Sequence, residues 1–250
     1  MTGYLDAHCH VDRFPSPVQV WRDAVDAGTV TIAVTELPSS FRLLAAKFGK
    51  RSGLRLALGF HPLRVAGCPP SELRLFQRLL ASTDYVGEVG LDFSQHGRAS
   101  RDQQVALLER LLSEPAIGRK VLSVHTRRAE QATIERLSAA RIHAILHWYS
   151  GPLGLIDEAL AAGLYFSINP AMTRSAHGRR VIAAIAPERA LTETDGPYVR
   201  VGQRPSEPAD MPALVDTLAA MWRVEPAEAR TRIWSNMAEL FSRATAPNQA

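Results

Sequence analysis

Short apolar runs rich in β-branched residues alternate along the chain with longer stretches whose apolar positions recur every three or four residues. The first pattern is typical of buried β-strands, and the second of amphipathic helices. We expect strands at 4–8, 30–34, 54–58, 85–89, 120–125, 143–148, 164–168 and 190–194. We expect helices at 17–27, 39–50, 71–82, 100–113, 128–140, 152–162, 177–186, 210–223 and 226–243.

This alternation predicts the fold class. Eight strand–helix units in about 245 residues match the size of a (β/α)8 barrel, so we expect an α/β protein with a single TIM-type barrel, regular or distorted. The composition does not shift along the chain, which predicts one domain over residues 1–245 and a short tail at 246–250. The loop at 196–211 is longer than a compact domain usually needs, which is typical of a functional loop.

Composition excludes several classes of protein. The chain is 46% apolar and 22% charged, which is ordinary for a globular protein and argues against disorder. No apolar run approaches the roughly 18 residues of a membrane-spanning helix, so no membrane partner is expected. The first residues lack the basic and apolar regions of a secretory signal. Only Cys9 and Cys68 are present, which favours a reducing cytoplasm over a disulfide scaffold.

The charge balance permits an anionic partner without requiring one. The net charge is +4, and 26 of the 29 basic residues are arginine. Guanidinium groups bind phosphate oxygens two at a time, so the arginine excess is compatible with phosphate recognition. Codon composition explains the same excess equally simply.

Residues of the kinds that bind metals gather at one end of the predicted strands. In a (β/α)8 barrel the active site lies at the carboxyl ends of the strands. Six candidates are expected there: His8 and His10 at the end of the first strand, Glu88 of the fourth, His125 of the fifth, His147 of the sixth and Asp195 of the eighth. A single histidine in such a place is usually a satisfied core residue, but the joint placement of all six predicts a metal centre.

The donor set favours two ions. Four imidazoles and two carboxylates exceed the needs of one tetrahedral zinc, so we expect two divalent ions with Glu88 between them. The nitrogen-rich set favours Zn or Mn, with Mg possible as well. Asp195 is expected to bind a metal and to take the proton of the attacking water. Glu193 shares its strand face and should lie deeper, where it would orient a ligand histidine, whereas Cys9 should point into the helix layer.

Seven short motifs resemble those of one family, the TatD family of metal-dependent deoxyribonucleases. The resemblance extends from residue 6 to residue 241 and rests on DAHCHVD (6–12), GFHP (59–62), GEVGLD (87–92), VHTRRA (124–129), LHWYSG (146–151), TETDGPY (192–198) and SNMAELF (235–241). It implies a barrel of the metal-dependent hydrolase superfamily and an enzyme that hydrolyses ester bonds of DNA. Members of the family are described as Mg- or Zn-dependent exo- or endodeoxyribonucleases.

The resemblance also implies residue roles. The family's metal ligands fall on the same six positions, with Glu88 and Asp195 in catalysis. Its GxHP histidine falls on His61, which is expected to be catalytic and to contact the substrate phosphate or a further metal. Arg127 matches the arginine of the H-x-R motif and is expected to hold phosphate. Trp148 and Tyr198, near the predicted mouth, are expected to stack on unpaired bases. For Tyr149, core packing explains the residue equally well.

Some departures from the family pattern point to a branch. Trp148 and Tyr149 replace the usual Cys-Phe, Arg127 is followed by a second arginine, and FSINPAM (166–172) replaces a Ser-x-x-Gly pattern. This combination is most similar to QatD, a component of the Qat anti-phage defence system. It implies a bacterial defence role, other Qat proteins as partners, and DNA as substrate, with 3′–5′ exonuclease action on single-stranded or frayed ends.

Two other functions remain open at this point. A metal hydrolase on the same barrel could act on a lactone, an amide or another ester, although many such enzymes carry a carboxylated lysine where this chain has Glu88. Alternatively, the protein could be a mainly non-catalytic subunit of a defence complex. The intact set of candidate ligands favours an enzyme.

Overall fold

The computed structural model describes residues 3–245. Its central sheet has eight parallel strands that pair in sequence order. They are β1 (Tyr4–Cys9), β2 (Thr29–Ala33), β3 (Leu54–Leu58), β4 (Tyr85–Gly90), β5 (Val121–His125), β6 (Ala144–His147), β7 (Tyr165–Ile168) and β8 (Ala190–Thr192). The helices that surround them are α1 (Pro17–Asp26), α2 (Pro38–Phe48), α3 (Pro70–Leu79), α4 (Arg101–Leu112), α5 (Glu130–Ala139), α6 (Ile156–Ala161), α7 (Pro170–Arg174), α8 (Ala176–Ala184), α9 (Met211–Trp222) and α10 (Pro226–Thr245).

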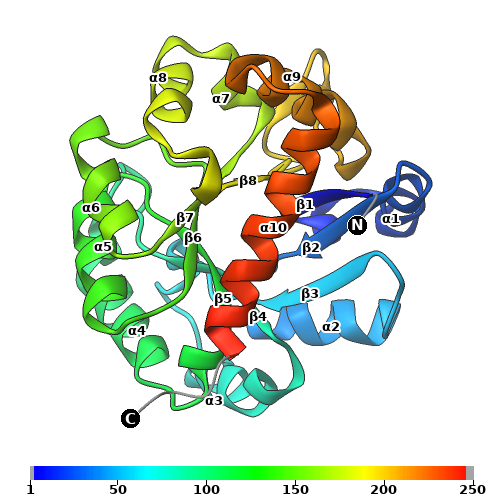
Figure 1. The fold of residues 1–250 in the computed structure, drawn as a ribbon. Coiled ribbons are helices and arrows are strands. Elements are labelled where there is room, and N and C mark those ends of the chain that lie inside the picture. The colour runs from blue at the N-terminus through cyan, green and yellow to red at the C-terminus, as the bar shows by residue number, and fades with distance from the viewer. Residues whose placement is uncertain (1–2, 246–250) are drawn as a thin grey trace.

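The strands curl into a nearly closed barrel with the helices outside, which confirms the predicted fold class (Figure 1). Within residues 3–245 no ladder of backbone hydrogen bonds joins β8 to β1. The buried carboxyl of Asp6 spans this seam instead. Its oxygens accept hydrogen bonds from the Thr194 amide (3.0 Å), the Thr194 hydroxyl (2.6 Å) and the His8 amide (3.2 Å). Beyond the end of β8, the Asp195 amide donates to the His8 carbonyl (2.9 Å) and the His10 amide to the Gly196 carbonyl (2.8 Å). The distortion that the sequence allowed for is therefore a seam closed by side chains and by isolated backbone hydrogen bonds.

Helix α10 covers the amino-terminal end of the barrel. It runs obliquely across the strands in Figure 1. Ile233 and Leu240 of this helix share an apolar cluster with Leu5, Val121 and Tyr165, which lie at or near the starts of their strands. Because this end is sealed by apolar packing, only the carboxyl ends of the strands are open to a ligand.

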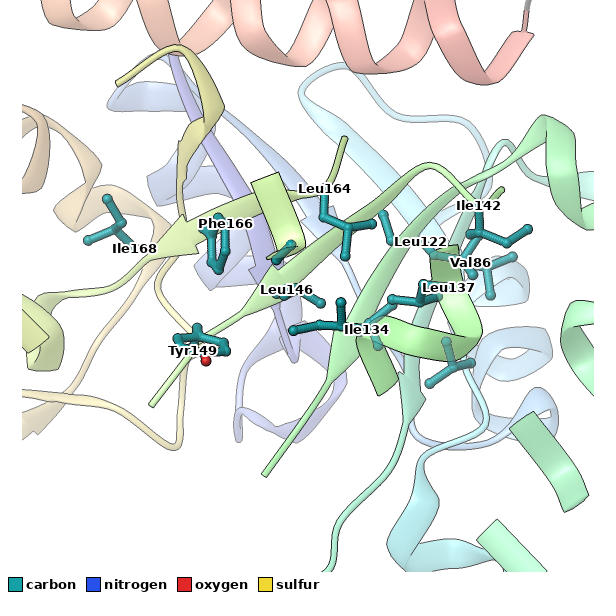
Figure 2. Packing of buried hydrophobic residues seen from close by; sticks show 14 of the residues in the cluster. Val86, Leu122, Ile134, Leu137, Ile142, Leu146, Tyr149, Leu164, Phe166 and Ile168 are labelled. Atoms are coloured by element: carbon teal, nitrogen blue, oxygen red, sulfur yellow. The ribbon is translucent and has the colours of Figure 1, made fainter. Parts of the chain in front are cut away.

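The main core lies between the sheet and the surrounding helices, from α2 to α9. Figure 2 shows Ile134 and Leu137 of α5 beside Leu122 and Leu146 of the strands. Tyr149 belongs to this core, since it is 1% exposed and its hydroxyl donates to the Pro152 carbonyl (2.7 Å). Of the two roles considered for this residue, the structure supports packing.

Predicted and observed bounds differ by up to four residues, as at the start of α6, and three differences bear on the site. Strand β8 ends at Thr192, not at 194. Helix α7 was not predicted, because five residues are too few for a helical period to show; it forms where the Asn169 side chain accepts hydrogen bonds from the amides of Ala171 and Met172. The loop at 196–211 contains a small hairpin, with strands β9 (Arg200–Val201) and β10 (Arg204–Pro205).

Two further predictions concern the extent of the domain and of the C-terminal tail. The predicted tail at 246–250 lies outside the described residues, and the single domain over 1–245 stays a prediction. No helix within residues 3–245 is both long and apolar enough to cross a membrane.

Candidate metal centre at the barrel mouth

Strand β1 and the residue that follows it present two histidines on one face. The side chains of His8 and His10 both point into the barrel, and their Nε2 atoms lie 3.2 Å apart. Cys9 between them packs with the apolar residues of α1 and α2, as predicted. The Nδ1 atom of His8 lies 2.7 Å from the Ser123 hydroxyl on β5. If this nitrogen carries the proton, the lone pair of Nε2 is free to face a metal ion.

Glu88 lies at the centre of the site, and its Oε2 atom faces the histidines of β1. This oxygen is 3.1 Å from His10 Nε2 and 3.7 Å from His8 Nε2. The carboxylate is only 2% exposed. A charge this deeply buried needs compensation, which the imidazoles supply.

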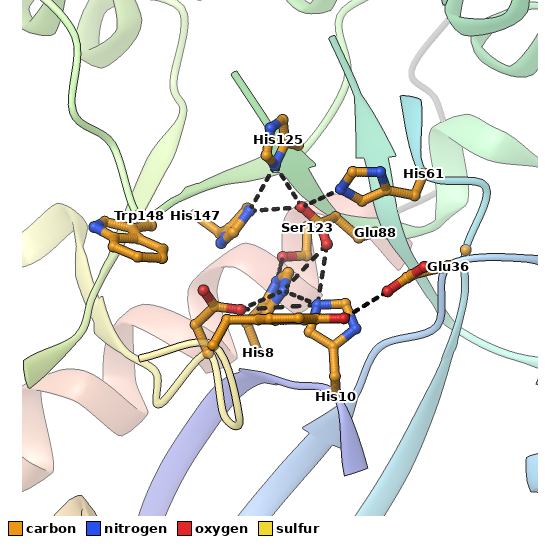
Figure 3. A network of polar contacts seen from close by, with 12 residues as sticks. His8, His10, Glu36, His61, Glu88, Ser123, His125, His147 and Trp148 are labelled. Atoms are coloured by element: carbon orange, nitrogen blue, oxygen red, sulfur yellow. Dashed lines mark hydrogen bonds and ion pairs between the residues drawn. The ribbon is translucent and has the colours of Figure 1, made fainter. Parts of the chain in front are cut away.

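The other oxygen of Glu88 faces a second group of imidazoles (Figure 3). Oε1 lies 2.6 Å from His125 Nδ1, 2.8 Å from His147 Nε2 and 3.3 Å from His61 Nε2. The two oxygens of the Glu88 carboxylate therefore face two different sets of imidazole nitrogens. This is the arrangement in which one carboxylate can be shared by two ions.

Asp195 reaches the site from beyond the end of β8. Its amide donates to the His8 carbonyl (2.9 Å), and its backbone has a positive φ of 47°. Its Oδ1 atom lies 3.6 Å from His8 Nε2 and 3.8 Å from His10 Nε2. The expectation that Asp195 ends a strand was wrong, because the chain leaves the sheet at Thr192 and turns toward β1. The expected location at the mouth is nevertheless where its side chain lies.

The electrostatics of the site follow from burial and proximity. Burial opposes the charge on Glu88, but His61 and His147 outweigh it and hold the pKa of this carboxyl well below its usual value. Burial likewise opposes a charge on His147, yet Glu88 and Glu193 raise the pKa of this imidazole well above normal. Burial raises the pKa of Asp195 to about 7. A carboxyl that titrates near neutral pH is suited to proton transfer.

The donor set fits divalent metal ions. Three triplets offer one ligand atom per residue within 4.8 Å of one another. Two of them include Glu88, with His8 and His10 in one and His61 and His125 in the other; the third consists of His8, His147 and Glu193. Buried imidazole nitrogens with carboxylate oxygens are the donors that Zn and Mn accept well.

His61 differs from the other histidines in its hydrogen bonding. It follows β3, and its Nδ1 atom accepts a hydrogen bond from the Leu63 amide (3.1 Å). Burial lowers the pKa of this imidazole. In the neutral ring the proton then lies on Nε2, which points toward Glu88 as a donor. Such a nitrogen can donate to a phosphate oxygen but cannot ligate a metal in that tautomer, so the geometry favours the first of the two roles considered for His61.

Several buried side chains hold these groups in place. Glu193 is fully buried; its Oε1 atom lies 3.8 Å from His147 Nδ1 and accepts hydrogen bonds from the Trp148 amide (2.9 Å) and Asn169 Nδ2 (3.0 Å). Asp92 lies 3.0 Å from His125 Nε2. Glu193 thus occupies the place predicted for it, beneath the mouth.

Sequence reasoning missed Ser123. Its signal was present, because it lies two residues before His125 on one strand and must share the barrel-facing side. Also missed was Glu36, which follows β2 and has no metal-type neighbour in sequence.

A cavity of about 660 Å³ opens above these residues. Arg127, Trp148 and Tyr198 line it, as predicted, together with Leu63 and Arg64. Of the five exposed large apolar side chains in the described part of the chain, three lie here: Leu63 (38% exposed), Trp148 (37%) and Tyr198 (53%). Exposed apolar surface concentrated at a polar cavity indicates a ligand with both apolar and charged parts.

The sequence is similar to several known proteins. The sequence matches the family model described as TatD related DNase over residues 5–242. It is 24% identical over 247 residues to an uncharacterized metal-dependent hydrolase of Methanocaldococcus jannaschii, covering 96% of this chain and 97% of that protein. It is 28% identical to the human deoxyribonuclease TATDN3, covering 78% of each chain. It is 31% identical to the 3′-5′ ssDNA/RNA exonuclease TatD of Edwardsiella piscicida, covering 62% of this chain and 65% of that one.

Solved structures share the fold. A TatD homologue from Escherichia coli superposes with a TM-score of 0.80 at 23% identity, covering 98% of both chains. An N-acetyl-D-glucosamine-6-phosphate deacetylase from Mycobacterium smegmatis superposes with a TM-score of 0.59 at 14% identity, covering 96% of this chain and 77% of that one. At such identities the likeness concerns the fold alone, and the fold serves hydrolases of more than one substrate class.

Proposed function

Because this chain is an enzyme of the TatD related DNase family of metal-dependent hydrolases, we propose that it hydrolyses phosphodiester bonds of single-stranded or frayed DNA from the 3′ end. The proposal depends on the position of Glu88. Its two oxygens face separate sets of imidazoles at the base of a cavity lined by arginine and aromatic side chains. A relative named a 3′-5′ ssDNA/RNA exonuclease supports both the polarity and the strand state, and makes RNA the alternative polymer.

Two divalent ions are the proposed cofactors, held by His8, His10, Glu88, His125, His147 and Asp195. When bound, such ions lower the pKa of a water molecule and supply positive charge against the phosphate oxygens. The imidazoles favour Zn or Mn, and Mg remains compatible with the carboxylates.

The side chains of this protein then have distinct tasks. Asp195, whose pKa burial raises to about 7, accepts the proton of the attacking water. His61 donates from Nε2 to a phosphate oxygen, and Arg127, which lines the same cavity, binds the same phosphate. Trp148 stacks on the terminal base, with Tyr198 as a second aromatic surface.

A role in anti-phage defence is a second, finer proposal. It rests on the QatD-like departures, one of which has a structural consequence at the site: Asn169 of the FSINPAM segment caps α7 and donates to Glu193. Working beside other Qat proteins in the cytoplasm is part of this proposal, and the two unpaired cysteines are compatible with that compartment. Loss of phage protection on Glu88→Ala substitution, within the complete set of Qat proteins, would support a catalytic role. Undiminished protection would instead indicate a non-catalytic subunit.

The nuclease is tested with metal-stripped protein resupplied with Mg, Mn or Zn. Single-stranded DNA and RNA oligonucleotides carrying a label at the 3′ or the 5′ end report polymer and polarity. Glu88→Ala should abolish cleavage, whereas Glu135→Ala, which removes an exposed carboxylate of α5, should not. Cleavage that persists in Glu88→Ala, or turnover of small carboxylic esters without any of nucleic acid, would refute the proposal.

A further inference from the structure

A second polar cluster lies beside the metal centre and has no assigned role. At its centre is Glu36, which follows β2 and is only 6% exposed. Its Oε2 atom accepts a hydrogen bond from Arg64 Nε (2.6 Å) and forms ion pairs with Arg64 Nη2 (2.5 Å) and Arg13 Nη2 (2.8 Å). Its Oε1 atom accepts a hydrogen bond from the Tyr198 hydroxyl (2.7 Å). One buried carboxylate thus gathers side chains from the segments that follow β1, β3 and β8.

This cluster is joined directly to the residues of the proposed reaction. The His61 amide donates to the Glu36 carbonyl (2.8 Å), and the Tyr198 ring meets the His10 ring edge-on with centroids 5.0 Å apart. Figure 3 shows Glu36 on the side of His10 and His61, and Trp148 on the opposite side of the imidazoles. A strand that stacks on Trp148 and crosses the metal centre in one direction would continue toward Glu36.

The two arginines of the cluster are not equivalent. Arg13 lies 3.6 Å from Asp12 as well as against Glu36, so two carboxylates share its charge. Arg64 pairs with Glu36 alone, its side chain is 48% exposed, and it lines the cavity. Glu36 holds one edge of this guanidinium through Nε and Nη2. Within residues 3–245, its Nη1 atom makes no hydrogen bond. The free edge offers the fork geometry that binds phosphate oxygens.

We propose that Arg64 binds the phosphate next to the scissile one, and that Glu36 is the positioning residue that fixes its guanidinium. This inference rests on the proposed nuclease function and adds its specificity: the site would distinguish a strand, which carries neighbouring phosphates, from an isolated phosphodiester. If the cluster around Glu36 served only to hold three loops together, it would not need a half-exposed guanidinium at the cavity wall.

The test compares two substrates, a single-stranded DNA oligonucleotide and bis(p-nitrophenyl) phosphate, which has one phosphate only. Arg64→Ala should lower kcat/KM for the oligonucleotide about tenfold or more relative to the small diester. Arg64→Lys keeps the charge but not the fork and should fall between. Glu36→Gln should also lower kcat/KM for the oligonucleotide relative to the small diester, because it should raise KM. Arg78→Ala, which removes an exposed arginine of α3, should change neither substrate.

Salt dependence provides a second readout. Oligonucleotide binding is measured by fluorescence anisotropy in Asp195→Asn protein at several salt concentrations. Replacing Arg64 by alanine should reduce the magnitude of the slope of log binding constant against log salt concentration by about 0.7. Turnover of the small diester by each variant that retains Asp195 reports that the substitution leaves the protein folded. If Arg64→Ala retains both the wild-type substrate ratio and the wild-type slope, the phosphate subsite is refuted while the nuclease stands. If the wild-type protein cleaves no nucleic acid, the proposed function fails and the subsite fails with it.

Discussion

The hydrogen bond between His8 and Ser123 makes a demanding prediction. The Ser123 hydroxyl lies 2.7 Å from His8 Nδ1, and both side chains are buried, at 4% and 0% exposure. Burial, together with His147, holds the pKa of His8 well below normal, so this ring is neutral and its single proton can be directed to Nδ1. Replacing Ser123 by alanine removes the acceptor and leaves a space of one hydroxyl, which is too small for a water molecule.

Two effects of Ser123→Ala follow, and they have separate magnitudes. Leaving a buried donor without a partner costs about 1–3 kcal/mol, which should appear in urea denaturation of the metal-free protein. Losing the group that orients a metal-binding histidine typically lowers metal affinity 10- to 100-fold. We expect both losses, the second measured by competition titration with Zn or Mn. Ser113→Ala, which removes an exposed hydroxyl bonded to the Arg110 carbonyl, should change stability by less than about 0.5 kcal/mol.

The two magnitudes also make the reasoning refutable. If Ser123→Ala loses stability but binds metal with wild-type affinity, the hydrogen bond is structural and does not orient His8. If neither quantity changes, the contact between the two side chains contributes nothing to the site.

Three further predictions concern different parts of the molecule. Trp148→Ala should weaken single-stranded DNA binding by about 1–3 kcal/mol, because stacking on the indole is lost. The salt dependence of binding should not change, because no charge is removed; unchanged affinity in an anisotropy titration would contradict this. Burial raises the pKa of Asp6 to about 8, so this carboxyl stabilises the fold below its unfolded pKa near 3.8 and loses that contribution as pH rises toward 8. The stability of metal-free Asp6→Asn should therefore fall less than that of the wild type between pH 4 and 8, and parallel denaturation curves would contradict this. Gly59→Ala would place a Cβ atom 1.5 Å from the Thr35 carbonyl oxygen, so a drop of at least about 1–3 kcal/mol in the free energy of unfolding is expected, and an unchanged urea midpoint would count against it.

Most strands could be predicted because parallel strands buried on both faces appear as continuous apolar runs. The prediction for β8 was two residues too long, since Glu193 and Asp195 follow the strand's alternation in sequence but leave the sheet in space. Helix α7 escaped prediction because its signal is the Asn169 cap and not a period. In each case a local hydrogen bond or a turn toward another strand overrode the pattern.

The sequence by itself determined which side chains stand at the mouth, because alternation along a strand decides the face of His8 and His10, and the carboxyl ends of parallel strands meet at one end of a barrel. Only the tertiary structure decided how they face one another. Glu88 divides its oxygens between imidazoles from four other segments, and Tyr198 reaches Glu36 across 162 residues of sequence. These contacts join segments that are far apart along the chain. A periodic pattern in the sequence reflects neighbouring residues only, so it cannot predict such contacts.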